Sequence, residues 1–212
     1  MTLKKENTEP EAAITFQPSA TVFNMWLELT GKGTITLDWG QGDVDIMDFD
    51  VDPENATATA FRVRDQSYST SIPPAKITGD VHLVVGLNFE AAVSALNTES
   101  APALALLAFL HADIPVLNLS TNHALTMLTF DNSTIGELIL PEQHKITYLS
   151  IAPSAFWPGT EQVDYIVSNI YLNTVAETLN NGTLALSNSP VSEESGIMLQ
   201  DLENTYGWLI TH

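Results

Sequence analysis

Hydrophobic and polar residues alternate along the first part of the chain in a way that predicts short β-strands. The run TITLDW alternates strictly and places Ile35, Leu37 and Trp39 on one face of a strand, between two glycine-containing turns. Similar runs recur between residues 14 and 85. Short strands at a spacing of about 8–12 residues are typical of a small β-sandwich.

A second pattern, L-x-x-L-x-Φ with Φ apolar, recurs in the middle of the chain. Its members are Leu104/Leu107/Phe109, Ile114/Leu117/Leu119, Leu125/Leu128/Phe130, Ile135/Leu138/Leu140 and Ile146/Leu149/Ile151, with Val81/Val84 and Val93/Leu96 as weaker examples. The first members of the five strong triplets lie 10, 11, 10 and 11 residues apart, so the full period is 21 residues with two half-turns per repeat. A period of about 20–29 residues with this pattern is typical of a leucine-rich solenoid. We therefore expect about three coils that bury a shared column of Leu and Ile.

The spacing becomes helical after Pro158. Thr160 can cap a helix, and an apolar stripe follows it as far as the Asn-Asn-Gly stop at residues 180–182. A short strand, a second amphipathic helix over Ser195–Tyr206 and a final strand over residues 208–210 complete this part. Such a segment suits the end piece that a solenoid needs to cover its last apolar coil.

These patterns predict an α+β fold that is mainly β. They divide the chain into a disordered lead-in over residues 1–13, a small β-sandwich over 14–80, a solenoid over 81–155 and an α/β cap over 156–212 that packs on the solenoid.

Three segments resemble one family. The segment GTITLDWGQG, residues 33–42, resembles the Gly-Thr-x-x-x-Asp-Trp-Gly-Asp-Gly turn that precedes the repeats in Bacteroidetes surface leucine-rich-repeat proteins, where it belongs to a PKD-like β-domain; Gln41 stands where that pattern has Asp. Residues 124–144 are similar to the 21-residue repeat of that family, and the C-terminal helix, NGTLALSN strand and YGW segment resemble its last module.

The repeats of this chain depart from the family pattern at two positions. Phe109 and Phe130 occupy the position of a family cysteine, and Ala112 and Ser133 occupy the position of a ladder asparagine. Without that asparagine the backbone groups it would satisfy need another partner, such as Ser133 or water. The resemblance implies a PKD-like domain over residues 14–80 and a secreted or surface-anchored protein that binds or adheres to others, with no enzymatic activity and no cofactor.

The charge balance restricts the partners. The chain has 26 acidic and 7 basic residues, a formal net charge of −19, and only Lys145 is basic after Lys76. Nucleic-acid binding is excluded because affinity for phosphates comes from Lys and Arg, and a protein or glycan partner should be neutral or basic. No run reaches the roughly 18 apolar residues of a membrane span. The absence of cysteine excludes thiol catalysis, disulfides and cysteine-ligated zinc.

The polar start of the chain leaves two interpretations of the protein's cellular location. Either the protein is cytosolic, or a secretion signal preceded Thr2, with a lipid or signal-derived tether upstream of residue 2. The polar stretch before the first strand favours the second, so we expect a secreted, cell-surface or periplasmic protein.

An acidic run lies in the predicted β-domain. It consists of Asp43, Asp45, Asp48, Asp50, Asp52 and Glu54. A calcium site would need several of these oxygens to converge, whereas strand alternation places Asp43 and Asp45 on one outward, solvated face that also resists edge pairing. We favour the solvated strand.

Two histidines lie one period apart. His123 and His144 are separated by 21 residues, so they would stack on adjacent coils about 4.8 Å apart and could share a metal or titrate as a pair. The alternative is that both are exposed loop residues, and no third ligand is evident.

Aromatic residues are the remaining candidates for binding. Tyr68, Phe156 and Trp157 would form a recognition patch if exposed, whereas the latter two would otherwise seal the solenoid end. Trp39 is expected in the core, with Asp38 fixing the turn through the backbone.

Hydrolase, zinc-protease and P-loop motifs are absent, so no catalytic residues are assigned. The sequence therefore predicts a non-enzymatic binding or adhesion protein. The alternative is a carbohydrate-binding or carbohydrate-active module, which an exposed aromatic platform with two convergent carboxylates would favour.

Overall fold

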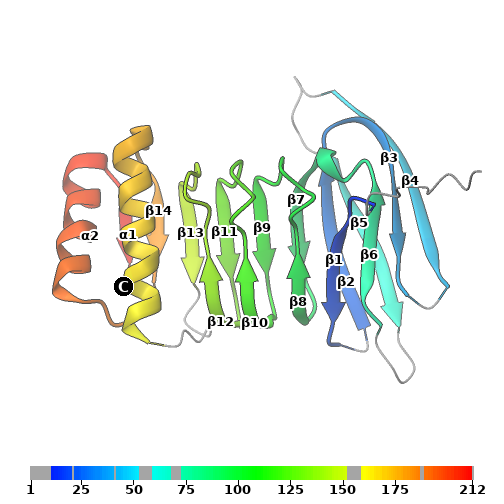
Figure 1. Ribbon diagram of the computed structural model, residues 1–212, viewed down its shortest axis with the longest axis horizontal. Helices are drawn as coiled ribbons and strands as arrows, with labels where there is room; N and C mark the ends of the chain where they lie inside the picture. The colour runs from blue at the N-terminus through cyan, green and yellow to red at the C-terminus, as the bar shows by residue number, and fades with distance from the viewer. Residues whose placement is uncertain are drawn as a thin grey trace, which may run out of the picture.

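In the computed structural model, the described part of the chain folds into two β layers that pack face to face, with two α-helices at one end (Figure 1). The protein is mainly β and contains a solenoid of about three turns, which confirms the coil number predicted from the period. The structure describes residues 11–20, 22–40, 42–52, 59–67, 73–151, 159–186 and 189–211.

One layer is a continuous sheet, with eight strands among the described residues in the order β15-β14-β13-β11-β9-β7-β2-β5. The strands are β2 (Val22–Leu29), β5 (Thr59–Ser67), β7 (Val84–Phe89), β9 (Leu106–Phe109), β11 (Met127–Phe130), β13 (Tyr148–Ile151), β14 (Thr183–Ala185) and β15 (Leu209–Thr211). Neighbours from β7 to β15 are parallel, whereas β2 is antiparallel to both β5 and β7. We call this layer the continuous sheet.

The opposite layer changes its structure along the molecule. It begins as an antiparallel sheet in the order β4-β3-β6-β1-β8, continues as the parallel pair β10-β12 and ends in helices α1 and α2 (Figure 1). Its elements are β1 (Ile14–Pro18), β3 (Gly31–Asp38), β4 (Val44–Val51), β6 (Ala75–Gly79), β8 (Val93–Asn97), β10 (Asp113–Asn118), β12 (Thr134–Ile139), α1 (Thr160–Glu177) and α2 (Glu193–Tyr206). The 3-10 turn η2 (Val81–Leu83) connects β6 to β7.

Each coil of the solenoid contributes one strand to each layer. In the continuous sheet Leu107 pairs with Leu128, and Leu128 pairs with Leu149; in the opposite layer Ile114 pairs with Ile135. Each pair is separated by 21 residues, which confirms the predicted period. The leucines and isoleucines of the repeat are buried between the layers, as the alternation predicts.

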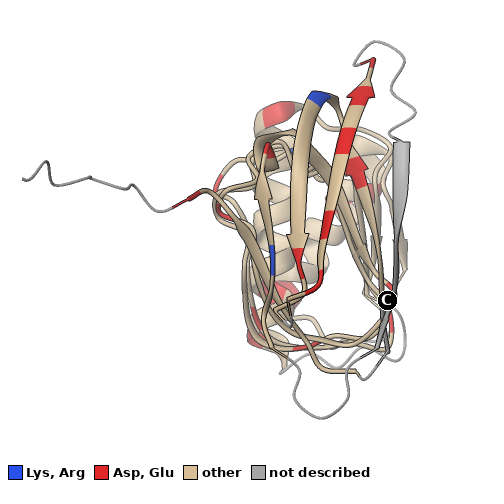
Figure 2. Ribbon diagram, turned by 90° about the vertical axis from the view of Figure 1, so that its right-hand side faces the viewer, with Lys and Arg blue, Asp and Glu red and all other residues tan. Residues whose placement is uncertain are grey.

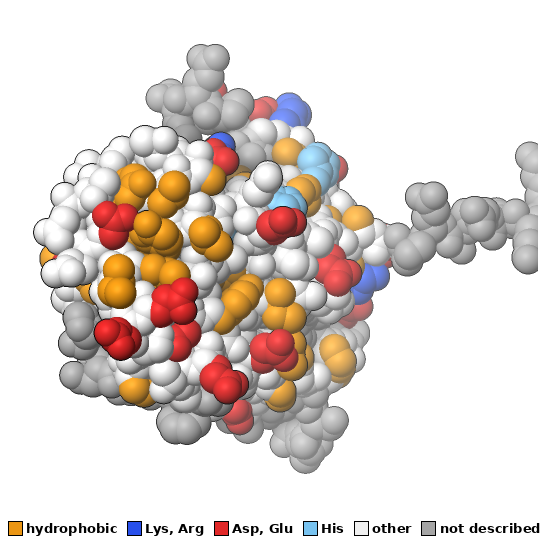
Figure 3. Space-filling model, turned by 60° about the vertical axis from the view of Figure 1, so that its left-hand side comes forward, with side chains coloured by type: hydrophobic (Ala, Val, Ile, Leu, Met, Phe, Trp, Pro, Cys, Tyr) orange, Lys and Arg blue, Asp and Glu red, His pale blue; other side chains and the backbone are white. Residues whose placement is uncertain are grey.

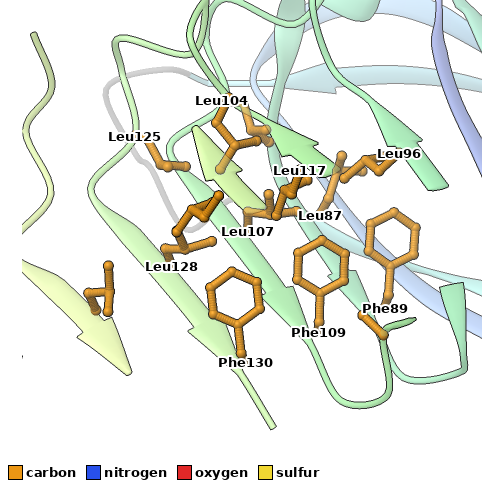
Figure 4. Close-up of a cluster of buried hydrophobic side chains, with 14 of the residues drawn as sticks. Leu87, Phe89, Leu96, Leu104, Leu107, Phe109, Leu117, Leu125, Leu128 and Phe130 are labelled. Atoms are coloured by element: carbon orange, nitrogen blue, oxygen red, sulfur yellow. The ribbon is translucent and has the colours of Figure 1, made fainter. Parts of the chain in front are cut away.

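Aromatic rings run through the core and connect the antiparallel region to the solenoid (Figure 4). Phe89, Phe109 and Phe130 stack with centroid separations of 5.4 and 5.5 Å. Phe16 lies 5.4 Å from Phe89 and meets Trp39 edge to face at 6.2 Å. Phenylalanine thus fills the interior position at which the repeat pattern described above has cysteine.

Buried polar side chains stabilise the corners between the layers. The Ser133 hydroxyl accepts a hydrogen bond from the Ala112 N–H at 2.9 Å, which confirms Ser133 as the partner expected in place of a ladder asparagine. At another corner the Asn122 amide donates to the carbonyls of Thr98 and Ala101 and accepts from the Thr98 hydroxyl. These bonds satisfy backbone groups that no strand can pair.

The two helices begin at positions that differ from the predicted ones. Gly159, not Thr160, is the residue before α1, and α2 begins at Glu193, two residues before the predicted Ser195. The Ser192 hydroxyl caps α2 by accepting from the Ser195 N–H, and Gly207 ends the helix in the left-handed conformation. Neither described helix is long and apolar enough to cross a lipid bilayer.

Candidate functional site

The predicted aromatic patch cannot be placed. Tyr68, Phe156 and Trp157 lie outside the described residues. Trp39 is buried at 1% exposure, and the Asp38 carboxylate accepts from the Gly40 N–H at 2.8 Å. The expected structural roles of Trp39 and Asp38 are therefore confirmed.

The acidic run is divided between the two faces of β4, which corrects the predicted orientation of Asp45. Its carboxylate is half-buried on the inward side and accepts from the Trp39 indole N–H at 2.9 Å. Ile46 instead faces outward and is 68% exposed. The prediction was wrong because Met47, Phe49 and Val51 set the inward face, and the buried indole provides Asp45 with a donor.

The outward acidic residues of β4 lie beside β3 (Figure 2), and their carboxylates bind neighbours on that strand. Lys32 donates to Asp50 at 2.8 Å, and the Thr34 hydroxyl donates to Asp48 at 2.6 Å. Among the described residues no three His, Asp or Glu side chains are grouped closely enough to hold a metal ion. Glu54 lies outside the described residues.

The two histidines have different environments although they lie one period apart. His123 is exposed, and its Nδ1 donates to the Gln143 carbonyl at 2.9 Å. His144 is buried, and both of its ring nitrogens are engaged: Nδ1 accepts from the Ile146 N–H at 3.1 Å and Nε2 donates to Asn169 Oδ1 at 2.7 Å. His144 therefore offers no nitrogen to a metal shared with His123.

His144 has a structural role at the last corner of the solenoid. In the previous coil the N–H of Leu125 donates to the backbone carbonyl of Asn122, and one period later the imidazole of His144 replaces that carbonyl. Burial lowers the pKa of His144, and the hydrogen bond to Asn169 on α1 opposes this shift. The neutral ring thus connects the last coil to α1.

The outer surface of the continuous sheet is a candidate surface for receiving a ligand. On β9, β11, β13, β14 and β15 the outward residues are Leu106, Ala108, Met127, Thr129, Tyr148, Ser150, Thr183, Ala185, Leu209 and Thr211. None of them is charged. We call this surface the uncharged face.

Strand register arranges the uncharged face in two rows. One row is mostly apolar and reads Leu106, Met127, Tyr148, Thr183 and Leu209 across neighbouring strands. The other row consists of small residues. Neighbouring strands lie about 4.8 Å apart, so each row is a regular ladder.

The sequence analysis did not single out this surface, although the repeat contains a signal for it. The residues on either side of the middle leucine in each strand triplet must point away from the core, because side chains alternate along a strand. They carry no charge in the triplets of the continuous sheet, centred on Leu107, Leu128 and Leu149, in a chain whose net charge is −19. In the opposite layer, by contrast, Glu137 stands beside Leu138.

The helical end carries a second group of exposed apolar side chains, with acidic side chains around them (Figure 3). Leu172 is 60% exposed, Val175 is 45% exposed and Ile197 is 65% exposed. Tyr171 on α1 donates to Asp201 on α2 at 2.9 Å and links the two helices. Acidic side chains surround this group, whereas none of the outward residues of the uncharged face is charged.

No protein-family model, curated protein or solved structure matches this chain.

Proposed function

We propose that this protein is a non-enzymatic binding or adhesion protein, secreted or held at the cell surface, and that its ligand contacts the uncharged face. The observation that carries the proposal is that five neighbouring parallel strands of the continuous sheet present a single ordered surface without one charged side chain. The chain as a whole carries a net charge of −19, so the absence of charge over this surface distinguishes it.

The physical properties of the uncharged face suit recognition. Its strands are already ordered by the core beneath them, so binding requires little loss of backbone freedom. Tyr148, at 37% exposure, and Leu209, at 62%, provide apolar contact area that is exposed without a partner in the described structure. The partner is a neutral or basic protein or glycan, because the net charge repels anions.

The alternative, a carbohydrate-active module, has less support in the described residues. The large aromatic side chains Phe16, Trp39, Phe89, Phe109, Phe130 and Trp208 are buried, whereas Trp26 is half-buried and its indole N–H donates to Glu90. The carboxylates of β4 are spread along a strand and bind β3 instead of converging. Among the described residues, the pair of Trp26 and Glu90 is therefore what supports this alternative.

The family assignment belongs to the same proposal. The 21-residue period and the parallel coils support a leucine-rich-repeat protein of the Bacteroidetes surface type. We interpret the antiparallel region as its PKD-like sandwich and the α1–β14–α2–β15 segment as the cap of the solenoid. The boundaries near residues 80 and 155 stay predictions, and the continuous sheet crosses both.

The proposal is tested by screening the intact protein on glycan and host-protein arrays and repeating each positive result with variants. We expect Leu209→Glu combined with Tyr148→Ala to weaken binding by about 100-fold, since the double variant adds a charge on the edge strand β15 and removes apolar contact on β13 in the middle of the face. Leu172→Glu is the matched control, because Leu172 is 60% exposed on α1 and lies off this surface.

Two results would contradict the proposal. Binding that survives the double variant but disappears with Leu172→Glu would move the site to the helical end. Binding lost only with Trp157→Ala, with stability unchanged, would place it at the predicted aromatic junction instead.

A further inference from the structure

The two helices at the end of the solenoid lie side by side and run in the same direction (Figure 1). Near their starts, the Asp164 carboxylate of α1 accepts from the N–H of Ser192, the N-cap of α2, at 3.0 Å. Beyond their ends, the N–H of Asn181 donates to the carbonyl of Tyr206, the last residue of α2, at 3.0 Å. Both N-terminal ends therefore lie together, and so do both C-terminal ends.

A groove between these helices exposes apolar side chains. Tyr171 on α1 donates to Asp201 on α2, so the sides of the helices that carry these two residues face each other. Val175, one turn after Tyr171, is 45% exposed, and Ile197, one turn before Asp201, is 65% exposed. The groove contains a hollow of about 320 Å³, lined by Tyr171, Ile197, Met198, Gln200, Asp201 and Asn204.

The core of the protein does not require these exposed side chains. The helices pack on the continuous sheet through a different set of apolar residues, which are buried: Val163, Ile166, Val167, Ile170, Leu199 and Leu202. An exposed helix position is usually polar. Apolar side chains that are grouped and surrounded by polar ones are typical of a surface that binds a partner.

The helices that form the groove are acidic (Figure 3). Their exposed carboxylates belong to Glu161, Glu177, Glu193, Glu194 and Glu203. No Lys or Arg follows Lys145 in the sequence, and neither helix has a basic residue in its last turn. The partial negative charges at the two adjacent C-terminal ends therefore add to the carboxylates of Glu177 and Glu203. A partner that carries positive charge beside apolar side chains complements this surface.

The same charges disfavour a second copy of this chain as the partner. Two copies that met through this groove would bring the same glutamates together, and each chain has a net charge of −19. The length of the groove suits a helix instead. Ile197 and Asn204 are seven residues apart, about 10 Å along α2, which matches the separation of side chains at i and i+7 on a partner helix.

We propose that the groove between α1 and α2 binds an amphipathic helix of another protein. Apolar side chains of that helix, spaced at i, i+3 or i+4 and i+7, pack between Val175 and Ile197, and Lys or Arg residues beside them lie over the glutamates. The groove belongs to the opposite layer, so its occupation does not depend on the uncharged face.

The test compares two displayed libraries of helical peptides of about 14 residues, or four turns. Both have leucine at i, i+4 and i+7; the flanking positions are Lys or Arg in one library and Asp or Glu in the other. Both libraries are selected on the intact protein, and an enriched peptide is titrated against isotopically labelled protein. We expect only the basic library to be enriched, shifted amide signals within α1 and α2, and an affinity that falls several-fold between about 0.05 and 0.5 M salt.

Two matched variants separate the groove from general attraction to an acidic protein. Ile197 is 65% exposed on α2, and Ile46 is 68% exposed on β4, between Asp45 and Asp48. We expect Ile197→Glu to weaken peptide binding about tenfold or more and Ile46→Glu to leave it unchanged. Leu209→Glu combined with Tyr148→Ala should also leave it unchanged, so this inference and the proposed function can fail separately.

A second pair of variants tests the charges. Glu177→Gln combined with Glu203→Gln should weaken binding about threefold and reduce its dependence on salt. Glu99→Gln combined with Asp113→Asn removes the same net charge from exposed positions on the solenoid coils and should change neither quantity.

Four outcomes would overturn the inference. The basic library yields no enriched peptide, or the acidic library is enriched equally, or Ile46→Glu weakens binding as much as Ile197→Glu does. The fourth is a dimer in analytical ultracentrifugation that Ile197→Glu dissociates, which would assign the groove to a second copy of this chain.

Discussion

The two layers of the molecule are built from the same repeats but differ in regularity. The continuous sheet keeps one strand per coil from β7 to β15, whereas the opposite layer passes from antiparallel strands to parallel strands and then to helices. The coil length explains this difference. Successive strands start 21 residues apart from Leu106 to Met127 and to Tyr148, then 35 residues apart from Tyr148 to Thr183 and 26 from Thr183 to Leu209.

The comparison shows where the fold accepts variation. Longer coils leave the continuous sheet unchanged, because the additional residues form α1 and α2 in the opposite layer. One layer therefore offers a constant, ordered surface, and the other contains the interruptions. A binding function that relies on regularity suits the first layer.

The largest expected effect comes from the core that both layers share. Phe109→Ala removes the middle ring of the Phe89–Phe109–Phe130 stack, which is 2% exposed. We expect the free energy of unfolding in urea to fall by about 4 kcal/mol, from lost burial and the cavity left behind. Leu106→Ala, on the outer side of the same strand, should reduce the free energy of unfolding much less. If the two substitutions cost the same, the phenylalanine stack would not be part of the shared core.

A smaller effect is expected at the corners that join the layers. Asn122→Ala removes two hydrogen bonds to backbone carbonyls and one from the Thr98 hydroxyl, all of them buried. The unsatisfied groups should cost about 2 kcal/mol in the free energy of unfolding.

Asn118→Ala is the control for that corner, because the exposed Asn118 side chain only accepts from the Ser120 N–H in the same coil. We expect it to cost less than about 1 kcal/mol. If Asn122→Ala cost no more stability than Asn118→Ala, solvent would have replaced the hydrogen bonds of Asn122.

The sequence predicts much of the continuous sheet and little of the opposite layer. The period of 21 identifies the coils, because every coil must bury the same leucine and isoleucine positions. Local alternation failed at Asp45, where outward and inward apolar residues compete and the indole of Trp39, six residues earlier, decides the orientation. The pairing of β8 with β1 could not be predicted either, since the two strands lie far apart in the chain.

A substitution at the start of α2 should reduce the free energy of unfolding less than one at the corners. Ser192→Ala removes the hydroxyl that accepts from the Ser195 N–H at 3.2 Å. We expect a loss of about 1 kcal/mol in the free energy of unfolding, while Ser192→Thr retains the capping hydroxyl and should restore it. Thermal unfolding followed by circular dichroism measures both, and equal stability of all three proteins would exclude a capping role.

The smallest effect is the pH dependence that His144 introduces at the junction of the last coil with α1. Burial lowers the pKa of His144 in the folded protein, so the unfolded chain binds its proton more readily. This stabilisation is fully present above the unfolded pKa of about 6.5 and is lost as the pH falls below it toward the folded pKa. The free energy of unfolding should therefore decline on acidification through this range.

His144→Gln separates this contribution from the titration of the many carboxylates. The variant should be less stable than the native protein at neutral pH, because the Ile146 N–H loses its acceptor, but its stability should change less between about pH 7 and 5. If His144→Gln kept the native slope, the decline would arise outside His144, and the junction between strand and helix would not be sensitive to protonation.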